Sequence, residues 1–308
     1  MRALTGGSAL AVLANVASPA FAHAGHAHAL DAPGWTWDPW ITVPLVASGL
    51  LFARGWHRLI RRSERGTWSL RRRGLWFALG WMTLAAALVS PLHEAGERSF
   101  AAHMFEHELL MLLAAPLLVL SAPTIVMLWA FPISARRALG AFGSSAPIAA
   151  SWRALTAPVT ATAVQAAALW LWHAPALFDR ALASEGWHAV QHLSFLLSAL
   201  FFWSAMIGHS PGRSRTAGTR SIAALCLFAT SVISGALGAL MAFSQSPWYA
   251  GYARMGMAPF GLTPAEDQQL AGLIMWIPGG LVHAAVALVM VKEVLNPAAI
   301  AGGAANAR

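Results

Sequence analysis

Seven long apolar segments limit what this chain can fold into more than any other feature. A soluble domain carries about 25% charged residues, whereas this chain has 10% charged and 57% hydrophobic residues. A helix of about 20 residues is long enough to cross a bilayer. The sequence therefore predicts an all-α integral membrane protein, a seven-transmembrane helix bundle. The predicted spans lie near residues 38–56, 74–91, 101–130, 156–174, 187–208, 221–243 and 267–291.

The N-terminus resembles a secretory signal peptide. Arg2 is followed by a modest apolar stretch, and Ala20-Phe21-Ala22 fits the small-x-small rule for cleavage. We therefore expect a signal peptide over residues 1–22 and a His-rich periplasmic tail over 23–37. The seven-span membrane domain would cover residues 38–295, and a cytoplasmic tail would cover 296–308.

The arginines predict the orientation. Eight lie between the first and second spans, three follow the third span and three follow the fifth. Positively charged loops stay in the cytoplasm, so we expect a multi-pass membrane protein with its N-terminus outside and its C-terminus inside. The net charge of +8 then reflects contact with the bilayer surface rather than with nucleic acid. No phosphate loop or dinucleotide fingerprint indicates a nucleotide partner.

Two histidine pairs share one spacing. His103 and His107 form the first pair, and His188 and His192 form the second. Residues four apart lie on the same face of a helix, and both pairs fall at the predicted outer ends of spans three and five. Intramembrane ionisable residues are costly and usually functional. Four imidazoles at matching depth predict a metal site.

More histidines gather on the same predicted side. Nine of the twelve histidines are expected outside, and only His57, His209 and His283 are expected toward the cytoplasm. A cleavage after Ala22 would also give the tail a free amine that could chelate copper with its imidazoles. The predicted metal ligands therefore extend beyond the two pairs to His93 and His173, with His23, His26 and His28 as accessory ligands.

Nearby methionines and carboxylates bear on which metal is bound. Imidazole suits copper, zinc, iron and nickel, while thioether favours Cu(I). Met104 lies within the first pair, and Met255 and Met257 lie in the predicted outer loop before the last span. Glu106 and Glu108 flank His107 and could orient an imidazole. The lone cysteine, Cys226, excludes a disulfide framework and a CxxC motif.

Four stretches together resemble the multi-span CtaG family of cytochrome c oxidase assembly proteins. They are His103-Met-Phe-Glu-His107 with its apolar continuation, Trp170-Leu-Trp-His-Ala-Pro-Ala-Leu-Phe-Asp179, Trp187-His-Ala-Val-Gln-His-Leu-Ser-Phe195, and Asp267-Gln-Gln-Leu-Ala-Gly-Leu-Ile-Met-Trp-Ile-Pro-Gly-Gly280. The resemblance covers nearly all of the chain after residue 35. It implies an assembly factor rather than an enzyme, with oxidase subunits as partners and copper as the metal handled.

The resemblance adds three polar residues to the expected site. Asp267 and Gln268 open the last span from outside and would close a polar cup above the histidines. Asp179 would contact either Arg180 or a histidine. Pro278 should kink the last span, and the neighbouring Gly279 and Gly280 should allow close helix approach.

Two other classes remain open as alternatives. Histidines on two helices can ligate haem iron axially, which would make the chain a membrane haem protein. His-rich membrane di-iron oxygenases also use HxxxH motifs, although the HxxHH motifs of that class are absent from this sequence. A metalloprotease is disfavoured because neither pair reads HExxH.

Overall fold

The computed structural model describes residues 33–63, 66–208 and 216–295. These residues form helices joined by turns and contain no strand, as the sequence predicts. The expected signal peptide, the tail histidines and the C-terminal tail lie outside the described residues.

The N-terminal part of the described chain is a helical hairpin. α1 (Pro39–Arg62) and α2 (Thr67–Val89) pack on each other through Phe52 and Phe77, whose rings stack at 3.7 Å. Arg54 and Arg58 of α1 donate hydrogen bonds to carbonyls of residues 129–131. The charged end of α1 is thereby tied to the end of α6 (Pro123–Leu128).

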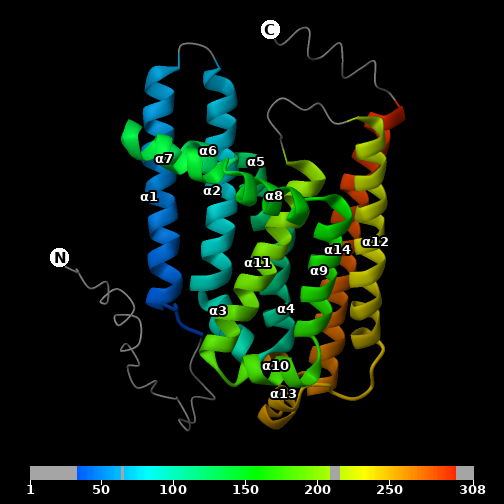
Figure 1. Ribbon diagram of the computed structural model, residues 1–308. Helices are drawn as coiled ribbons and strands as arrows, with labels where there is room; N and C mark the ends of the chain where they lie inside the picture. The colour runs from blue at the N-terminus through cyan, green and yellow to red at the C-terminus, as the bar shows by residue number, and fades with distance from the viewer. Residues whose placement is uncertain (1–32, 64–65, 209–215, 296–308) are drawn as a thin grey trace, which may run out of the picture. The chain divides into compact units, whose positions relative to one another are not determined.

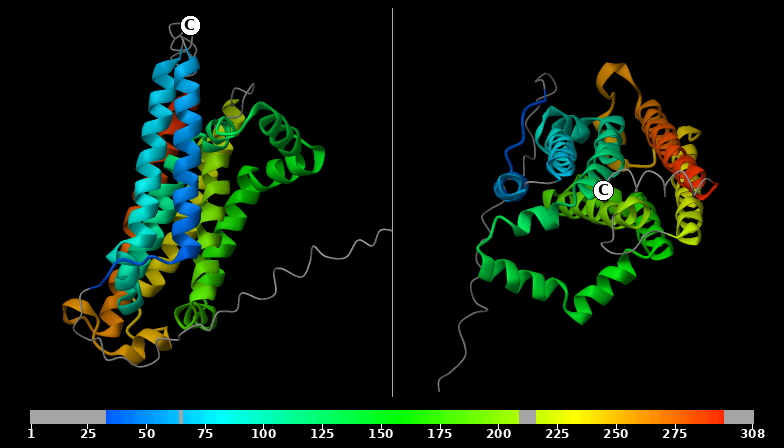
Figure 2. Two further views of the ribbon diagram at one scale, coloured as in Figure 1. Left: turned by 90° about the vertical axis from the view of Figure 1, so that its left-hand side faces the viewer. Right: turned by 90° about the horizontal axis from the view of Figure 1, so that it is seen from above.

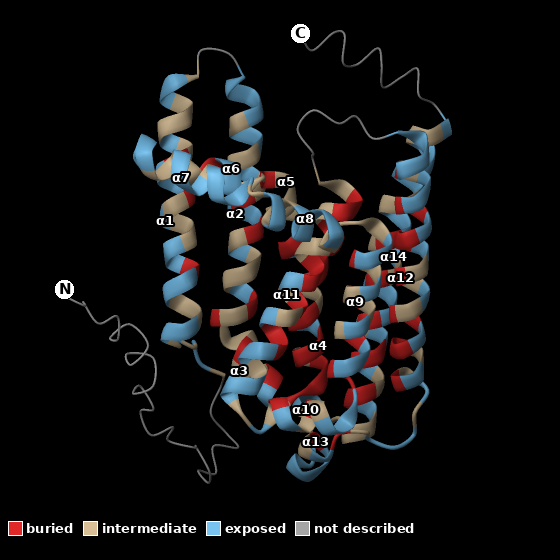
Figure 3. Cartoon of the chain, viewed as in Figure 1, coloured by how far each residue is buried: buried red, intermediate tan, exposed pale blue. Residues whose placement is uncertain are grey.

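Most of the remaining helices form the main bundle (Figure 1). Its buried side chains concentrate where α4, α9, α11, α12 and α14 meet (Figure 3). The C-terminal ends of α11 and α14 share one end of the bundle, and α3, α10 and α13 lie at the other (Figure 1). The helices are α3 (Pro91–Arg98), α4 (Phe100–Glu108), a π-helical segment (Leu109–Ala114), α5 (Ala115–Ser121), α7 (Ile133–Gly143), α8 (Ala146–Leu155), α9 (Pro158–Trp172), α10 (Pro175–Leu182), α11 (Glu185–Ile207), α12 (Ala217–Ala242), α13 (Ala250–Met255), a 3-10 turn (Pro259–Gly261) and α14 (Pro264–Leu295).

Four helices of the described residues are long and apolar enough to cross a membrane: Phe100–Ser121, Glu185–Ile207, Ala217–Ala242 and Pro264–Leu295. The number rises to six if each of two bent pairs is one span. These pairs are α2 with α3, bent by 45°, and α8 with α9, bent by 69°. The chain thus has the helices of a multi-pass membrane protein. The first predicted span forms α1 but is not among these helices, so seven spans stay a prediction.

The overlong third span, predicted over 101–130, is divided in the structure. Helix Phe100–Ser121 ends at Ala122, whose φ of 48° and ψ of 58° are left-handed, and α6 follows. Pro116 does not break this helix but lies two residues after the end of the π-helical segment. Proline has no amide hydrogen and clashes with the carbonyl four residues earlier, and the wider turn accommodates it.

Helices α7 and α8 bury no residue. They extend away from the bundle as an angled arm (Figure 2).

The last helix differs from the expectation at its centre. α14 runs unbroken through Pro278. Close approach occurs earlier, where a methyl group on Gly272 would lie 2.5 Å from the carbonyl oxygen of Gly238 on α12. Methyl groups on Gly279 and Gly280 would meet only ordinary contacts at 3.7–4.0 Å. The glycine contact between α12 and α14 therefore lies near the C-terminal end of α12 and in the first half of α14, and not at the proline.

This contact predicts the effect of a small substitution. Gly272→Ala should force α12 and α14 apart and lower the free energy of unfolding by about 1–3 kcal/mol. Gly280→Ala, on the same helix, is the matched control because its methyl group would be 3.8 Å from its nearest neighbour. Thermal unfolding in detergent measures both. Equal midpoints for the two variants would contradict the close packing.

Candidate metal centre

The first turn of α4 is held by a residue from the far end of the chain. Asp267, near the start of α14, accepts hydrogen bonds from the Ser99 hydroxyl (2.8 Å) and from the backbone amides of Phe100 (2.6 Å) and Ala101 (3.3 Å). A carboxylate at a helix N-terminus satisfies free amides and complements the helix dipole. Asp267 therefore fixes the helix that carries the first histidine pair.

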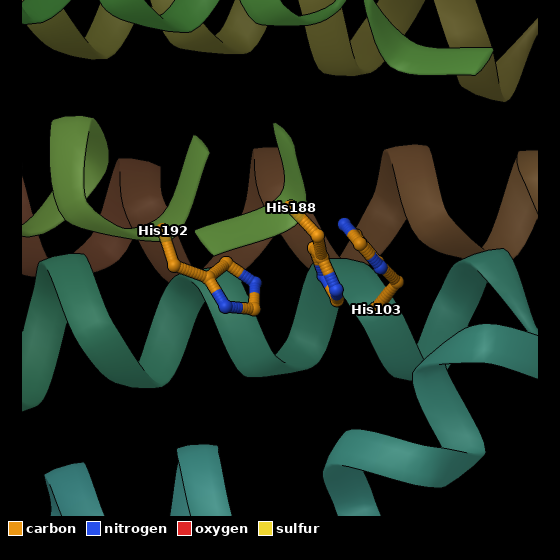
Figure 4. Close-up of side chains that lie close together, drawn as sticks. All are labelled: His103, His188 and His192. Atoms are coloured by element: carbon orange, nitrogen blue, oxygen red, sulfur yellow. The ribbon is translucent and has the colours of Figure 1, made fainter. Parts of the chain in front are cut away.

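The two histidine pairs meet between α4 and α11. Ring centroids are 4.3 Å apart for His103 and His107, and 4.2 Å apart for His188 and His192. Across the helices, His103 is 5.1 Å from His188, and His107 is 5.0 Å from His192. Figure 4 shows three of these side chains projecting from the two helices toward one another. All four are buried except His188, which is half-buried.

His93 and Glu106 join the same cluster. The Nδ1 atom of His93 lies 2.8 Å from Oε1 of Glu106, and the Nδ1 atom of His192 lies 3.8 Å from the same oxygen. The His93 ring stacks on His188 at 5.2 Å. Glu106, which is fully buried, therefore orients the His93 imidazole, as carboxylates commonly do beside metal-binding histidines, and lies close to the His192 imidazole.

His173 occupies a neighbouring position. Its Nδ1 lies 2.7 Å from the carbonyl oxygen of Leu169, and its Nε2 lies 3.3 Å from the sulfur of Met104. In the neutral ring, Nδ1 donates to the carbonyl and Nε2 is left with a free lone pair. His173 packs on Phe195, and its imidazole forms a separate nitrogen and sulfur pair with Met104.

Most nitrogen atoms of the cluster have no hydrogen-bond partner. Nearly all buried polar atoms in proteins are hydrogen-bonded, so a group of unpaired imidazoles needs an explanation. Two groups of three residues could hold a metal ion, because within each group one ligand atom from each residue lies within 4.8 Å of the others. The groups are His103, His188 and His192, and His93, Glu106 and His192. The unpaired atoms are both nitrogens of His103 and His107, Nε2 of His188 and His192, and Oε2 of Glu106.

Several predicted residues lie elsewhere. Asp179 contacts neither Arg180 nor a histidine; it accepts hydrogen bonds from the amides of residues 250 and 251 at the start of α13. Gln268 binds the backbone of residues 246 and 248. Both residues hold the segment of residues 246–251 in place instead of contacting the histidines. Met255 and Met257 are 55% and 63% exposed.

Two residues that the sequence analysis did not single out support the cluster. Gln191, which lies between the second pair in the sequence, is fully buried, and neither polar atom of its amide has a hydrogen-bond partner. Tyr252 of α13 donates a hydrogen bond to the carbonyl of Gly96 in α3. Burial raises the pKa of the Tyr252 phenol well above its ordinary value, so it stays a donor. Gln191 could have been found from its place inside the HxxxH spacing, whereas Tyr252 had no local signal.

The histidine pairs and the long apolar helices agree with a comparison of the whole sequence. The profile of the cytochrome c oxidase caa3 assembly factor family, Caa3_CtaG, matches residues 50–296. The chain belongs to this family. The resemblance recognised from the four sequence stretches is confirmed, and the match includes every described residue of the cluster.

The Caa3_CtaG chain also resembles longer mycobacterial proteins. Uncharacterized proteins of Mycobacterium bovis and Mycobacterium tuberculosis are each 27% identical over 256 residues, and one of Mycobacterium leprae is 26% identical over 257. The matches cover 79% of this chain and 36% of each relative. This chain thus spans about a third of the length of these relatives. No solved structure matches it.

Proposed function

We propose that this Caa3_CtaG protein binds copper at its histidine cluster and assists the insertion of copper into a haem–copper oxidase. The proposal rests on one observation, the group of buried imidazole nitrogens without hydrogen-bond partners. Metals bind neutral imidazole through such lone pairs. Copper is the cargo of the protein in this scheme, and no turnover chemistry is required.

His103, His188 and His192 are the best candidates for direct ligands because their nitrogen atoms lie within 4.8 Å of one another. Glu106 and His93 adjoin His192 and would adjust its orientation. The nitrogen and sulfur pair of His173 and Met104 offers softer donors, which suit Cu(I). His188 is the most accessible of these imidazoles and would be the first to exchange a ligand with an oxidase subunit.

The direction of transfer follows from the predicted orientation. We place the protein in the bacterial plasma membrane with seven spans, its N-terminus outside and its C-terminus in the cytoplasm. The cluster would then lie at the outer side, near α3, α10 and α13. The expected copper ligands His23, His26 and His28 would belong to a tail on that same side.

A haem protein and a di-iron oxygenase fit the cluster less well. The imidazole rings pack directly on one another at 4.2–5.9 Å, so a porphyrin could enter only by displacing them. The His-rich di-iron oxygenases also use HxxHH motifs, which are absent from this sequence.

Metal analysis with optical spectra on the purified protein tests the proposal directly. We expect copper to bind and to be removed by a competing chelator, with no Soret band and no stoichiometric iron. Copper added back should bind again, because the ligands are held by the fold. A Soret band, or iron that resists chelation, would replace the copper assignment by one of the two alternatives.

A further inference from the structure

A polar cavity, separate from the histidine cluster, lies inside the bundle about two to four helical turns along α14 from Asp267. Its volume is about 30 Å³, and roughly 10–15 Å³ on this measure holds one water molecule. Its chemistry comes from five helical segments that are far apart in the sequence. The polar and sulfur-containing residues that line it are Glu108, Met111, Gln165, Thr230, Ser234, Met275 and His283.

Glu108 faces this cavity and is separate from the histidine cluster. Its Oε2 atom is buried and has no hydrogen-bond partner. A methyl group on Gly279 would lie 3.7 Å from this oxygen, so the carboxylate sits against the middle of α14. An unpaired carboxylate inside a membrane protein is expensive and is usually functional.

The face of α14 beside Glu108 carries two more potential ligands. Met275, Gly279 and His283 are spaced four apart and therefore share one face. His283 is 5% exposed, and its Nδ1 atom has no hydrogen-bond partner. Its ring stacks on Trp203 at 5.8 Å. The Glu108 carboxylate thus lies against Gly279, between the Met275 thioether and the His283 imidazole on the same face of α14.

The other walls do not neutralise the carboxylate. The hydroxyls of Thr230 and Ser234 donate to backbone carbonyls of their own helix. Gln165 directs its amide nitrogen to the sulfur of Met111 at 3.3 Å, and its Oε1 is unpaired. These walls supply oxygen and sulfur atoms, and no lysine or arginine is among the described residues that line this cavity.

The π-helical turn shapes one wall of the cavity. The amide of Ala115 bonds to the carbonyl of Leu110, five residues earlier. The carbonyl of Met111 is thereby released from the helix and accepts a hydrogen bond from the Trp203 indole at 2.7 Å. The turn therefore positions both Met111 and the ring that stacks on His283. Such π-helical turns occur frequently at functional sites.

We propose that this cavity is a second metal site, which takes one soft monovalent cation of the Cu(I) class. Its ligands are the Glu108 carboxylate and the His283 imidazole, with the thioethers of Met111 and Met275. The carboxylate supplies the negative charge, and the thioethers select a soft ion over Na⁺ or Mg²⁺. This inference rests on the proposed copper function and adds a second copper-binding site to it, within the membrane interior.

The experiment isolates the inner site by removing the outer one. A variant combining His103→Ala, His188→Ala and His192→Ala, purified in detergent, should still bind one Cu(I) or Ag(I). Adding Glu108→Gln or His283→Gln should weaken that binding by about 100-fold or more. Loss of a group that only orients a metal ligand already costs up to about 100-fold, and these two residues are proposed as direct ligands. X-ray absorption should show sulfur ligands that diminish in Met275→Leu.

Matched controls remove a carboxylate or an imidazole outside the cavity. Glu293→Gln removes the partner of Arg220 at the end of α14, and His57→Gln removes an exposed histidine of α1. Neither should change the remaining Cu(I) site. Size-exclusion elution verifies folding, and Met275→Leu serves as a volume-conserving variant if Glu108→Gln does not fold.

The outcomes separate the two proposals. If the outer-site variant binds no Cu(I) while the wild type does, the inner site is excluded and the proposed function stands. If binding persists but is unaffected by Glu108→Gln, His283→Gln and Met275→Leu, the ion lies elsewhere and the inference fails. If the wild type itself binds no copper, the proposed function fails as well.

Discussion

Replacing His192 by alanine is expected to abolish copper retention and active oxidase together, while the protein still inserts into the membrane. His192 belongs to both sets of candidate ligand atoms and contacts five of the other side chains in the cluster. His103→Ala should act in the same direction but leave the second set intact. Copper content of the purified protein and oxidase activity of membranes measure the effect.

A buried imidazole also contributes packing, so the variants need matched comparisons. His192→Gln retains much of the side-chain volume and should lose copper as fully as His192→Ala. His57→Ala, at an exposed position on α1, should retain both copper and oxidase. Normal oxidase activity with His192→Ala, at equal protein levels, would remove the cluster from the assembly function.

The sequence predicted the site best where the residues that matter lie on the same helix at a regular spacing. Both histidine pairs have a four-residue spacing, and that spacing alone requires the two rings of each pair to share a helix face. Their predicted position at the same end of two spans then brought four imidazoles together. Nothing comparable exists for His93, whose contact with Glu106 depends on the bend between α2 and α3.

Helix geometry also explains why the two glutamates beside His107 have different surroundings. Residues two apart on an α-helix point about 200° apart, so Glu106 and Glu108 cannot face the same cluster. The structure directs Glu106 to the histidines and Glu108 to the inner cavity. The prediction grouped them because it used proximity in the chain instead of angular position.

Contacts between distant segments could not be read from local patterns. The place of His283 in the wall of the inner cavity, for example, depends on the packing of α14 along α12 and α4. The end of the third span at Ala122 depends on one left-handed residue, which is unusual for alanine. An alanine before a proline does not reveal that conformation in the sequence.

Asp267→Ala is expected to destabilise the protein by about 2–5 kcal/mol, because it leaves a buried hydroxyl and two buried amides without their acceptor. Unlike the histidine substitutions, Asp267→Ala removes no proposed metal ligand. It removes the anchor of α4 and should therefore displace His103 and His107. Copper affinity should therefore fall although no ligand has been removed. Thermal unfolding in detergent and a copper titration measure the two effects.

Conservative and neighbouring substitutions distinguish this anchoring from a general loss of charge. Asp267→Asn keeps the shape and one acceptor oxygen, so its loss of stability should lie between those of wild type and Asp267→Ala. Glu266→Ala removes the adjacent carboxylate, which is exposed to solvent and accepts hydrogen bonds from the amide and hydroxyl of Thr263; copper affinity should not change. If Asp267→Ala unfolds at the wild-type temperature, the carboxylate does not hold α4, and the geometry of the histidine cluster must depend on packing alone.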